Sequence, residues 1–134
     1  MFYSQNLKEM RQFYLNTWNK KHNQSLSDLE KKIIHVLEMH PEYQKYICAE
    51  YLESTFEKKN PFLHLGLHLA IQEQIQTNRP IGIQSVYLKL TQKYSNQHDV
   101  EHIMMEVLQF FVWEAQQQNK APDEQQYIEK LSEL

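Results

Sequence analysis

The chain lacks the several cysteines of a disulfide framework and the long apolar run of a membrane anchor. Its single cysteine, Cys48, excludes an internal disulfide and a cysteine cluster for zinc, so a reducing compartment is expected. No run approaches the roughly 18 apolar residues of a membrane span, and the N-terminus has no basic stretch followed by an apolar one. These absences predict a cytoplasmic protein with no membrane association.

An excess of basic residues is also missing. The formal net charge is -3, whereas a surface that grips phosphate backbones needs a net basic face. A helix-turn-helix made by the fourth and fifth expected helices is disfavoured as well, because the fifth offers only Lys89 and Lys93 as cations. Nucleic acid is therefore an unlikely partner.

Glycine and proline are both scarce. The two glycines, Gly66 and Gly82, stand alone, so the chain has no glycine-rich phosphate loop. The four prolines fall where helical patterns start or stop, and no alternating polar and apolar stretch suggests a strand. This combination predicts an all-α protein with short connections.

Apolar residues at helical spacing, by contrast, are plentiful. The 134 residues are 41% hydrophobic, which suits a single domain over residues 1–134 with a core of its own. We expect a compact bundle of about six to seven helices. The expected segments are about 5–19, a second helix to about 39, a short third from 41, then about 62–77, 83–94, 96–119 and a final one around 127–131.

Local signals place several of these boundaries. Ser27 to Glu30 has the pattern of a capping box, in which each side chain satisfies a backbone N–H at a helix start. Asn60 followed by Pro61 is a second start signal, and Asn96 can cap the sixth helix. His40 before Pro41 is expected to end the second helix.

Two pairs of histidines share the same four-residue spacing. His64 and His68 lie on the fourth expected helix, and His98 and His102 lie on the sixth, where Glu106 continues the series. A four-residue step turns a helix by only about 40°, so each pair shares one face. If the two helices face each other, these five residues form a candidate metal site, and iron, zinc, manganese and nickel all suit its imidazole and carboxylate ligands.

Two nearby carboxylates do not fit a first coordination shell. Glu73 lies on the opposite side of the fourth helix from His64. Glu101 lies away from His102 on the sixth helix and could support a ligand only from behind. The sequence names no catalytic residue, and Cys48 has no evident activating partner along the chain.

The histidines also have a structural interpretation. His68 shares its helix face with Ile71 and Ile75, so a buried hydrogen-bond network without metal is an alternative. The His98 and His102 stripe is also compatible with a solvated helix face. The chain would then be a protein-interaction or adaptor module, and its tyrosine and methionine content leaves a homodimer open.

Several motifs resemble one family. They are Asn60–His68, Glu73–Gln74, Arg79–Ile83 and His98–Glu106, with Met10–Phe13, Trp18, His40–Tyr43, Trp113–Gln116 and Pro122–Glu124 adding to the likeness. Together they resemble a family of small bacterial proteins known as domain of unknown function 1841, over nearly the whole chain. The resemblance implies a bacterial, cytoplasmic protein without an assigned activity. That family often has His at the position of Gln44 and Glu at that of Phe110, so this chain lacks one carboxylate near Glu106.

Overall fold

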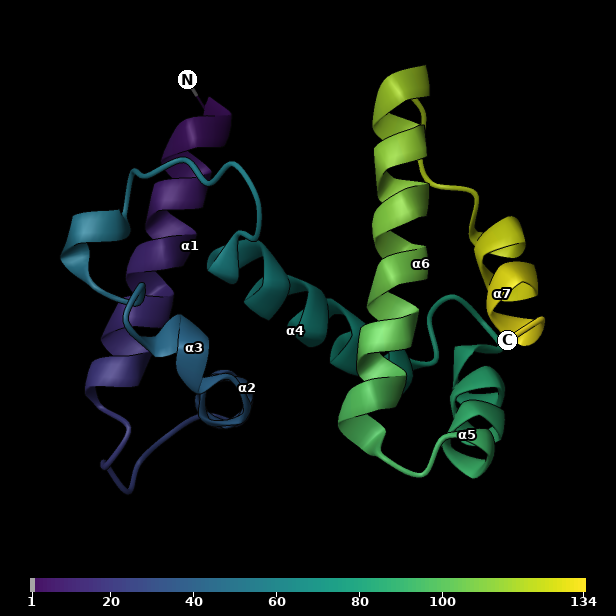
Figure 1. Ribbon diagram of the computed structural model, residues 1–134, viewed down its shortest axis with the longest axis horizontal. Helices are drawn as coiled ribbons and strands as arrows, with labels where there is room; N and C mark the ends of the chain where they lie inside the picture. Colours follow the sequence, from purple (N-terminus) through teal and green to yellow (C-terminus); the bar gives the residue numbers. More distant parts are fainter. Residues whose placement is uncertain (1) are drawn as a thin grey trace. The chain divides into compact units, whose positions relative to one another are not determined.

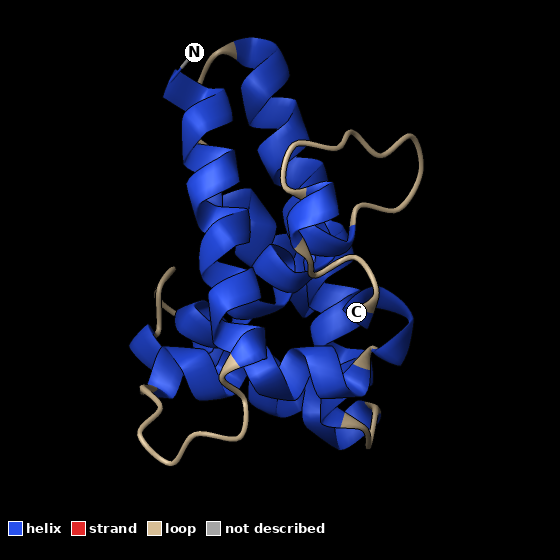
Figure 2. Ribbon diagram, turned by 90° about the vertical axis from the view of Figure 1, so that its left-hand side faces the viewer, coloured by secondary structure: helices blue, strands red, loops and turns tan. Residues whose placement is uncertain are grey.

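The computed structural model describes residues 2–134, with side chains from Asn6 onward. The described residues form helices, turns and loops without a strand, which confirms the all-α prediction (Figure 2). Seven α-helices and one 3-10 helix follow one another along them (Figure 1). Their bounds are α1 Phe2–Asn19, α2 Asp28–Met39, α3 Pro41–Gln44, η1 Ala49–Tyr51, α4 Pro61–Thr77, α5 Ile83–Lys93, α6 Gln97–Gln118 and α7 Glu124–Ser132.

Short polar residues start these helices in the way that the sequence predicts. Ser27 Oγ accepts from Glu30 N at 3.1 Å, and Glu30 Oε1 accepts from Ser27 N at 2.9 Å, which completes the capping box of α2. Asn60 Oδ1 accepts from the backbone N–H of Phe62 at 3.0 Å, and Asn96 Oδ1 from that of His98 at 2.8 Å. These caps fix where α4 and α6, the two helices that carry the histidine pairs, begin.

The segment after Pro41 differs from the prediction of a short continuous helix. Helix α3 ends at Gln44, and the chain then turns before the separate helix η1. The Arg11 guanidinium, from α1, donates to the carbonyl oxygens of Tyr51, Leu52 and Ser54 at 3.3, 3.3 and 2.8 Å. A side chain 40 or more residues away therefore supplies hydrogen bonds to the end of this segment.

Internal contacts divide the chain into two units, with the boundary inside α4 after Gly66. In the N-terminal unit α1 packs on α2 and α2 on α3, around a core that includes Ile33 and Leu37. In the C-terminal unit α5, α6 and α7 pack on one another (Figure 1). The core of this unit includes Ile71 and Met104, both fully buried. The single domain over 1–134 stays a prediction.

The break between α4 and α5 follows from two residues with positive φ. Asn78 has φ 52° and Gly82 has φ 102°, a region that glycine and asparagine adopt most readily. Asn78 Oδ1 accepts from the N–H groups of Gly82 and Gln84, both at 3.2 Å. The predicted stop at 78–82 is therefore confirmed.

Hydropathy along the described helices gives no candidate membrane span. None of them combines the length and the apolar character that crossing a bilayer requires.

Candidate metal site

Helix α4 positions two of the candidate ligands. His64 and His68 lie four residues apart on it, so the helix places both imidazoles on one face. His68 is fully buried and His64 is half-buried. Each of them contacts a different histidine, and the two resulting pairs lie in different units.

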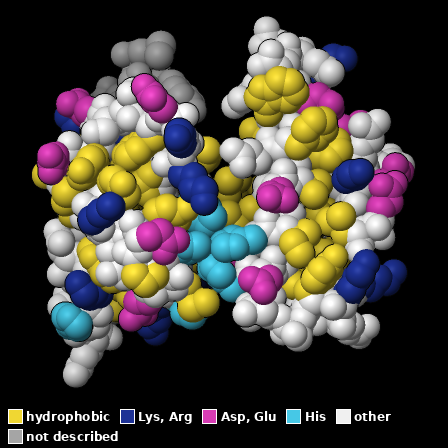
Figure 3. Space-filling model, in the orientation of Figure 1, with side chains coloured by type: hydrophobic (Ala, Val, Ile, Leu, Met, Phe, Trp, Pro, Cys, Tyr) yellow, Lys and Arg dark blue, Asp and Glu magenta, His cyan; other side chains and the backbone are white. Residues whose placement is uncertain are grey.

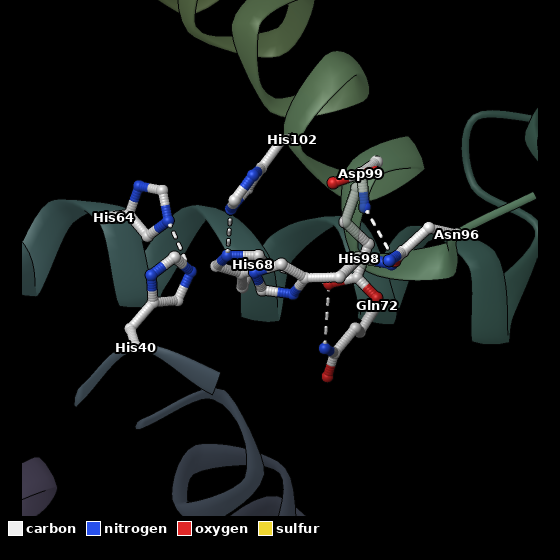
Figure 4. Close-up of polar contacts among 9 residues, drawn as sticks. His40, His64, His68, Gln72, Asn96, His98, Asp99 and His102 are labelled. Carbon is white, nitrogen blue, oxygen red and sulfur yellow. Dashed lines mark hydrogen bonds and ion pairs between the residues drawn. The ribbon is translucent and has the colours of Figure 1, made fainter. Parts of the chain in front are cut away.

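The N-terminal pair consists of His64 and His40. Their Nε2 atoms lie 3.1 Å apart (Figure 4). His40 is the residue between α2 and α3, and its Nδ1 lies 2.9 Å from Glu42 Oε2. The Tyr43 ring stacks on His40 with centroids 5.0 Å apart. The turn at Pro41 thus supplies an imidazole, a carboxylate and an aromatic wall from four consecutive residues.

The C-terminal pair consists of His68 and His102, from α4 and α6. Their Nε2 atoms also lie 3.1 Å apart (Figure 4). On the other side of the ring, His68 Nδ1 lies 2.8 Å from Oε1 of Glu101, a carboxylate that is 5% exposed. Gln72 Nε2 donates to the same oxygen at 3.1 Å. Glu101 therefore contacts one nitrogen of the buried His68 ring, and His102 contacts the other.

Hydrogen bonds, burial and the carboxylate charges shift the pKa values of several groups around the two histidine pairs. The hydrogen bond from His40, together with Glu42's own backbone N–H, lowers the pKa of Glu42. Burial and then the charge of Glu42 raise the pKa of Tyr43. Burial and then the charge of Glu101 raise the pKa of Tyr87. Both tyrosines are therefore neutral at physiological pH.

Of the predicted site residues, the structure brings His68, His98 and His102 together in the C-terminal unit. Within the N-terminal unit His40 and His64, and within the C-terminal unit His68 and His102, offer ring nitrogens that could hold a metal ion. His98 stacks on the face of the His68 ring, with centroids 4.7 Å apart and planes 15° apart. Parallel stacked rings do not aim their in-plane nitrogens at one point, so ligation by His98 stays a prediction.

Glu106 lies one turn beyond His102 on α6 and is exposed. It lines a small groove of about 210 Å³ with Val107, Phe110, Phe111 and Lys130. The polar stripe on α6 therefore faces α4 at its N-terminal end, at His98 and His102, and solvent further along. Glu106 as a ligand also stays a prediction.

Sequence reasoning missed His40 as a candidate ligand. From the sequence, His40 is predicted only to end α2, because it precedes Pro41. A His-Pro-Glu sequence at a helix boundary is the one local signal, since it places a carboxylate two residues from the imidazole. Glu101 contacts Nδ1 of His68 at 2.8 Å and not its chain neighbour His102, and its support of a metal ligand stays a prediction.

A second feature lies on the outer face of α6. Phe110 and Trp113 are 52% and 55% exposed, with ring centroids 6.2 Å apart. Figure 3 shows hydrophobic side chains at the surface over this helix. Phe111 of the same helix is buried in the core, whereas Phe110 and Trp113 lie at the surface.

Comparison with known proteins and protein families identifies the family of the chain. No curated protein and no solved structure matches the chain. A family model with the description "Domain of unknown function (DUF1841)" matches residues 6–133. This range includes both histidine pairs and both carboxylates behind them. The match covers nearly the whole chain, so the chain belongs to the DUF1841 family.

Proposed function

We propose that the C-terminal unit binds one transition-metal ion through Nε2 of His68 and Nε2 of His102. The observation that carries the proposal is the approach of these two atoms to 3.1 Å. Two imidazole nitrogens bound at about 2.0–2.1 Å to one tetrahedral ion lie about 3.3 Å apart, so little movement is needed to admit an ion. Burial of His68 and its contact with Glu101 are the usual surroundings of such a ligand.

The ligand chemistry favours a borderline divalent ion. Two neutral imidazoles suit zinc, copper, nickel and ferrous iron, whereas manganese and magnesium prefer carboxylate, carbonyl and water oxygens. Among the metals that the sequence left open, the general order of affinities places zinc and nickel above iron and manganese. A metal with so few protein ligands would supply a polarised water as its chemistry.

Metal uptake tests the proposal. Untagged protein stripped with a chelator is dialysed against zinc, and bound zinc is measured by elemental analysis. We expect about one ion per chain from the C-terminal pair, lost in His68→Ala and in His102→Ala. The matched control is His35→Ala, which removes an exposed histidine of α2 and should keep the ion. Wild-type protein that takes up neither zinc nor nickel contradicts the proposal.

The N-terminal pair is a second set of ligands with the same geometry. His40 and His64 also present Nε2 atoms 3.1 Å apart, with Glu42 behind His40. The zinc content of His40→Ala should be measured in the same dialysis experiment. If this variant binds less zinc than the wild type, the missing zinc is assigned to the N-terminal pair, and any zinc that it still binds lies elsewhere.

The exposed aromatics favour a second candidate function, self-association through α6. Phe110 and Trp113 belong to residue types that are enriched at protein interfaces. We expect sedimentation velocity to show a concentration-dependent dimer that Phe110→Ser with Trp113→Ser converts to a monomer. Leu88→Ser, which changes a 60% exposed side chain of α5, is the control. Wild-type protein that stays monomeric at every concentration contradicts this candidate.

A further inference from the structure

The proton on the His68 ring can be located from its neighbours. Oε1 of Glu101 lies 2.8 Å from His68 Nδ1 and 3.1 Å from Gln72 Nε2. An amide nitrogen only donates, so this oxygen acts as an acceptor toward Gln72. An ionised carboxylate has no hydrogen to donate, so the hydrogen in its contact with His68 must be carried by Nδ1 of the imidazole. The two contacts therefore select one tautomer of His68.

The position of that proton determines what the other nitrogen can do. In a neutral imidazole only one nitrogen carries hydrogen, so Nδ1–H leaves a lone pair on Nε2. This Nε2 is the atom that faces His102 at 3.1 Å. It accepts a hydrogen bond from His102 in the metal-free protein, and the same lone pair is the one that a metal ion needs.

We propose that Glu101 is a positioning residue that holds His68 in its Nδ1–H tautomer and aims Nε2 at the metal. The part of this inference that concerns metal affinity rests on the proposed function, whereas the tautomer does not. Burial strengthens the effect, because Glu101 and His68 are 6% and 0% exposed as side chains and water cannot replace their contact.

The N-terminal unit repeats the arrangement with a weaker support. His40 Nδ1 lies 2.9 Å from Glu42 Oε2, and His40 Nε2 faces His64 Nε2. The His40 side chain is 8% exposed, but that of Glu42 is 59% exposed. Water competes for this carboxylate, so Glu42 holds its histidine less firmly than Glu101 does.

The tautomer is measured first, in metal-free protein. Long-range nitrogen–proton NMR of histidine-labelled protein distinguishes a ring nitrogen that carries hydrogen from one with a lone pair. We expect Nδ1 of His68 to carry the hydrogen in the wild type. A wild-type spectrum with the hydrogen on Nε2 overturns the inference, and this result does not depend on any variant or on whether metal binds.

The variant Glu101→Gln tests the consequence. The amide keeps the shape of Glu101, but its NH₂ group can donate to His68 Nδ1 and so move the ring hydrogen onto Nε2. We expect zinc affinity, measured by competition with a chromophoric chelator, to fall by about 10- to 100-fold. Glu73→Gln, an exposed carboxylate of α4, is the control and should leave the affinity unchanged.

Two outcomes separate this inference from the proposed function. Unchanged zinc affinity in Glu101→Gln, with the wild type binding zinc, overturns the positioning role while metal binding stands. Wild-type protein that binds neither zinc nor nickel but shows the Nδ1–H form of His68 contradicts the proposed function and supports the tautomer assignment. The buried Glu101 and His68 would then act together as a hydrogen-bond network.

Discussion

Zinc at about a thousand times its dissociation constant is expected to raise the free energy of unfolding of the wild-type protein by about 4 kcal/mol. The reason is mass action, because the folded chain holds the Nε2 atoms of His68 and His102 3.1 Å apart and an unfolded chain does not. Urea denaturation followed by circular dichroism, with and without zinc, measures the gain. A chelator should reverse it.

The double variant His68→Ala with His102→Ala is expected to lose this gain, since both ligands are gone. Its denaturation midpoint should be the same with and without zinc. His35→Ala should keep the full gain, because His35 is an exposed residue of α2. A gain of equal size in the double variant would mean that zinc stabilises the chain elsewhere, and the assignment to His68 and His102 would be wrong.

Ile71→Ala is expected to lower the free energy of unfolding by about 2–5 kcal/mol, through lost burial and the cavity left behind. Ile71 is fully buried and belongs to the core formed with α5, α6 and α7. It also lies three residues after His68 on α4, so it shares that face of the helix. The same urea titration, without zinc, measures the effect.

The control for Ile71→Ala is Leu88→Ala on α5, where a leucine is 60% exposed. This change should stay within about 0.5 kcal/mol, as surface substitutions usually do. If Ile71→Ala cost less than Leu88→Ala, Ile71 could not lie in the core of the C-terminal unit.

The starts and stops of the helices could be predicted from the sequence because they depend on neighbouring residues. The capping box at Ser27, the cap and proline at Asn60 and Pro61, and the break at Asn78 and Gly82 are all interactions within a few residues. The segment after Pro41 could not be predicted in the same way. Arg11, 40 or more residues earlier in the chain, donates hydrogen bonds to the carbonyl groups of Tyr51, Leu52 and Ser54 at its end.

The candidate site also has features that the sequence predicts and features that depend on helix packing. Helical spacing predicted that His64 and His68 share a face of α4, because that relation depends on one helix alone. It also places Glu106 on the same face of α6 as His102, but only the structure shows that His102 contacts His68 whereas Glu106 is exposed. Which residues of a helix face its neighbour depends on how the helices pack, and spacing along one helix does not contain that information.

The amino-acid sequence is enough to predict the all-α class, the helix boundaries at caps and prolines, and the two histidine pairs at four-residue spacing. Helix packing is needed to show that His68 contacts His102, that Glu101 contacts the other side of His68, and that His40 contacts His64. The physical reason is the range of the interactions involved. Caps and helical faces arise within a few residues, whereas these contacts join residues 24 to 34 positions apart, which come together only when the helices pack.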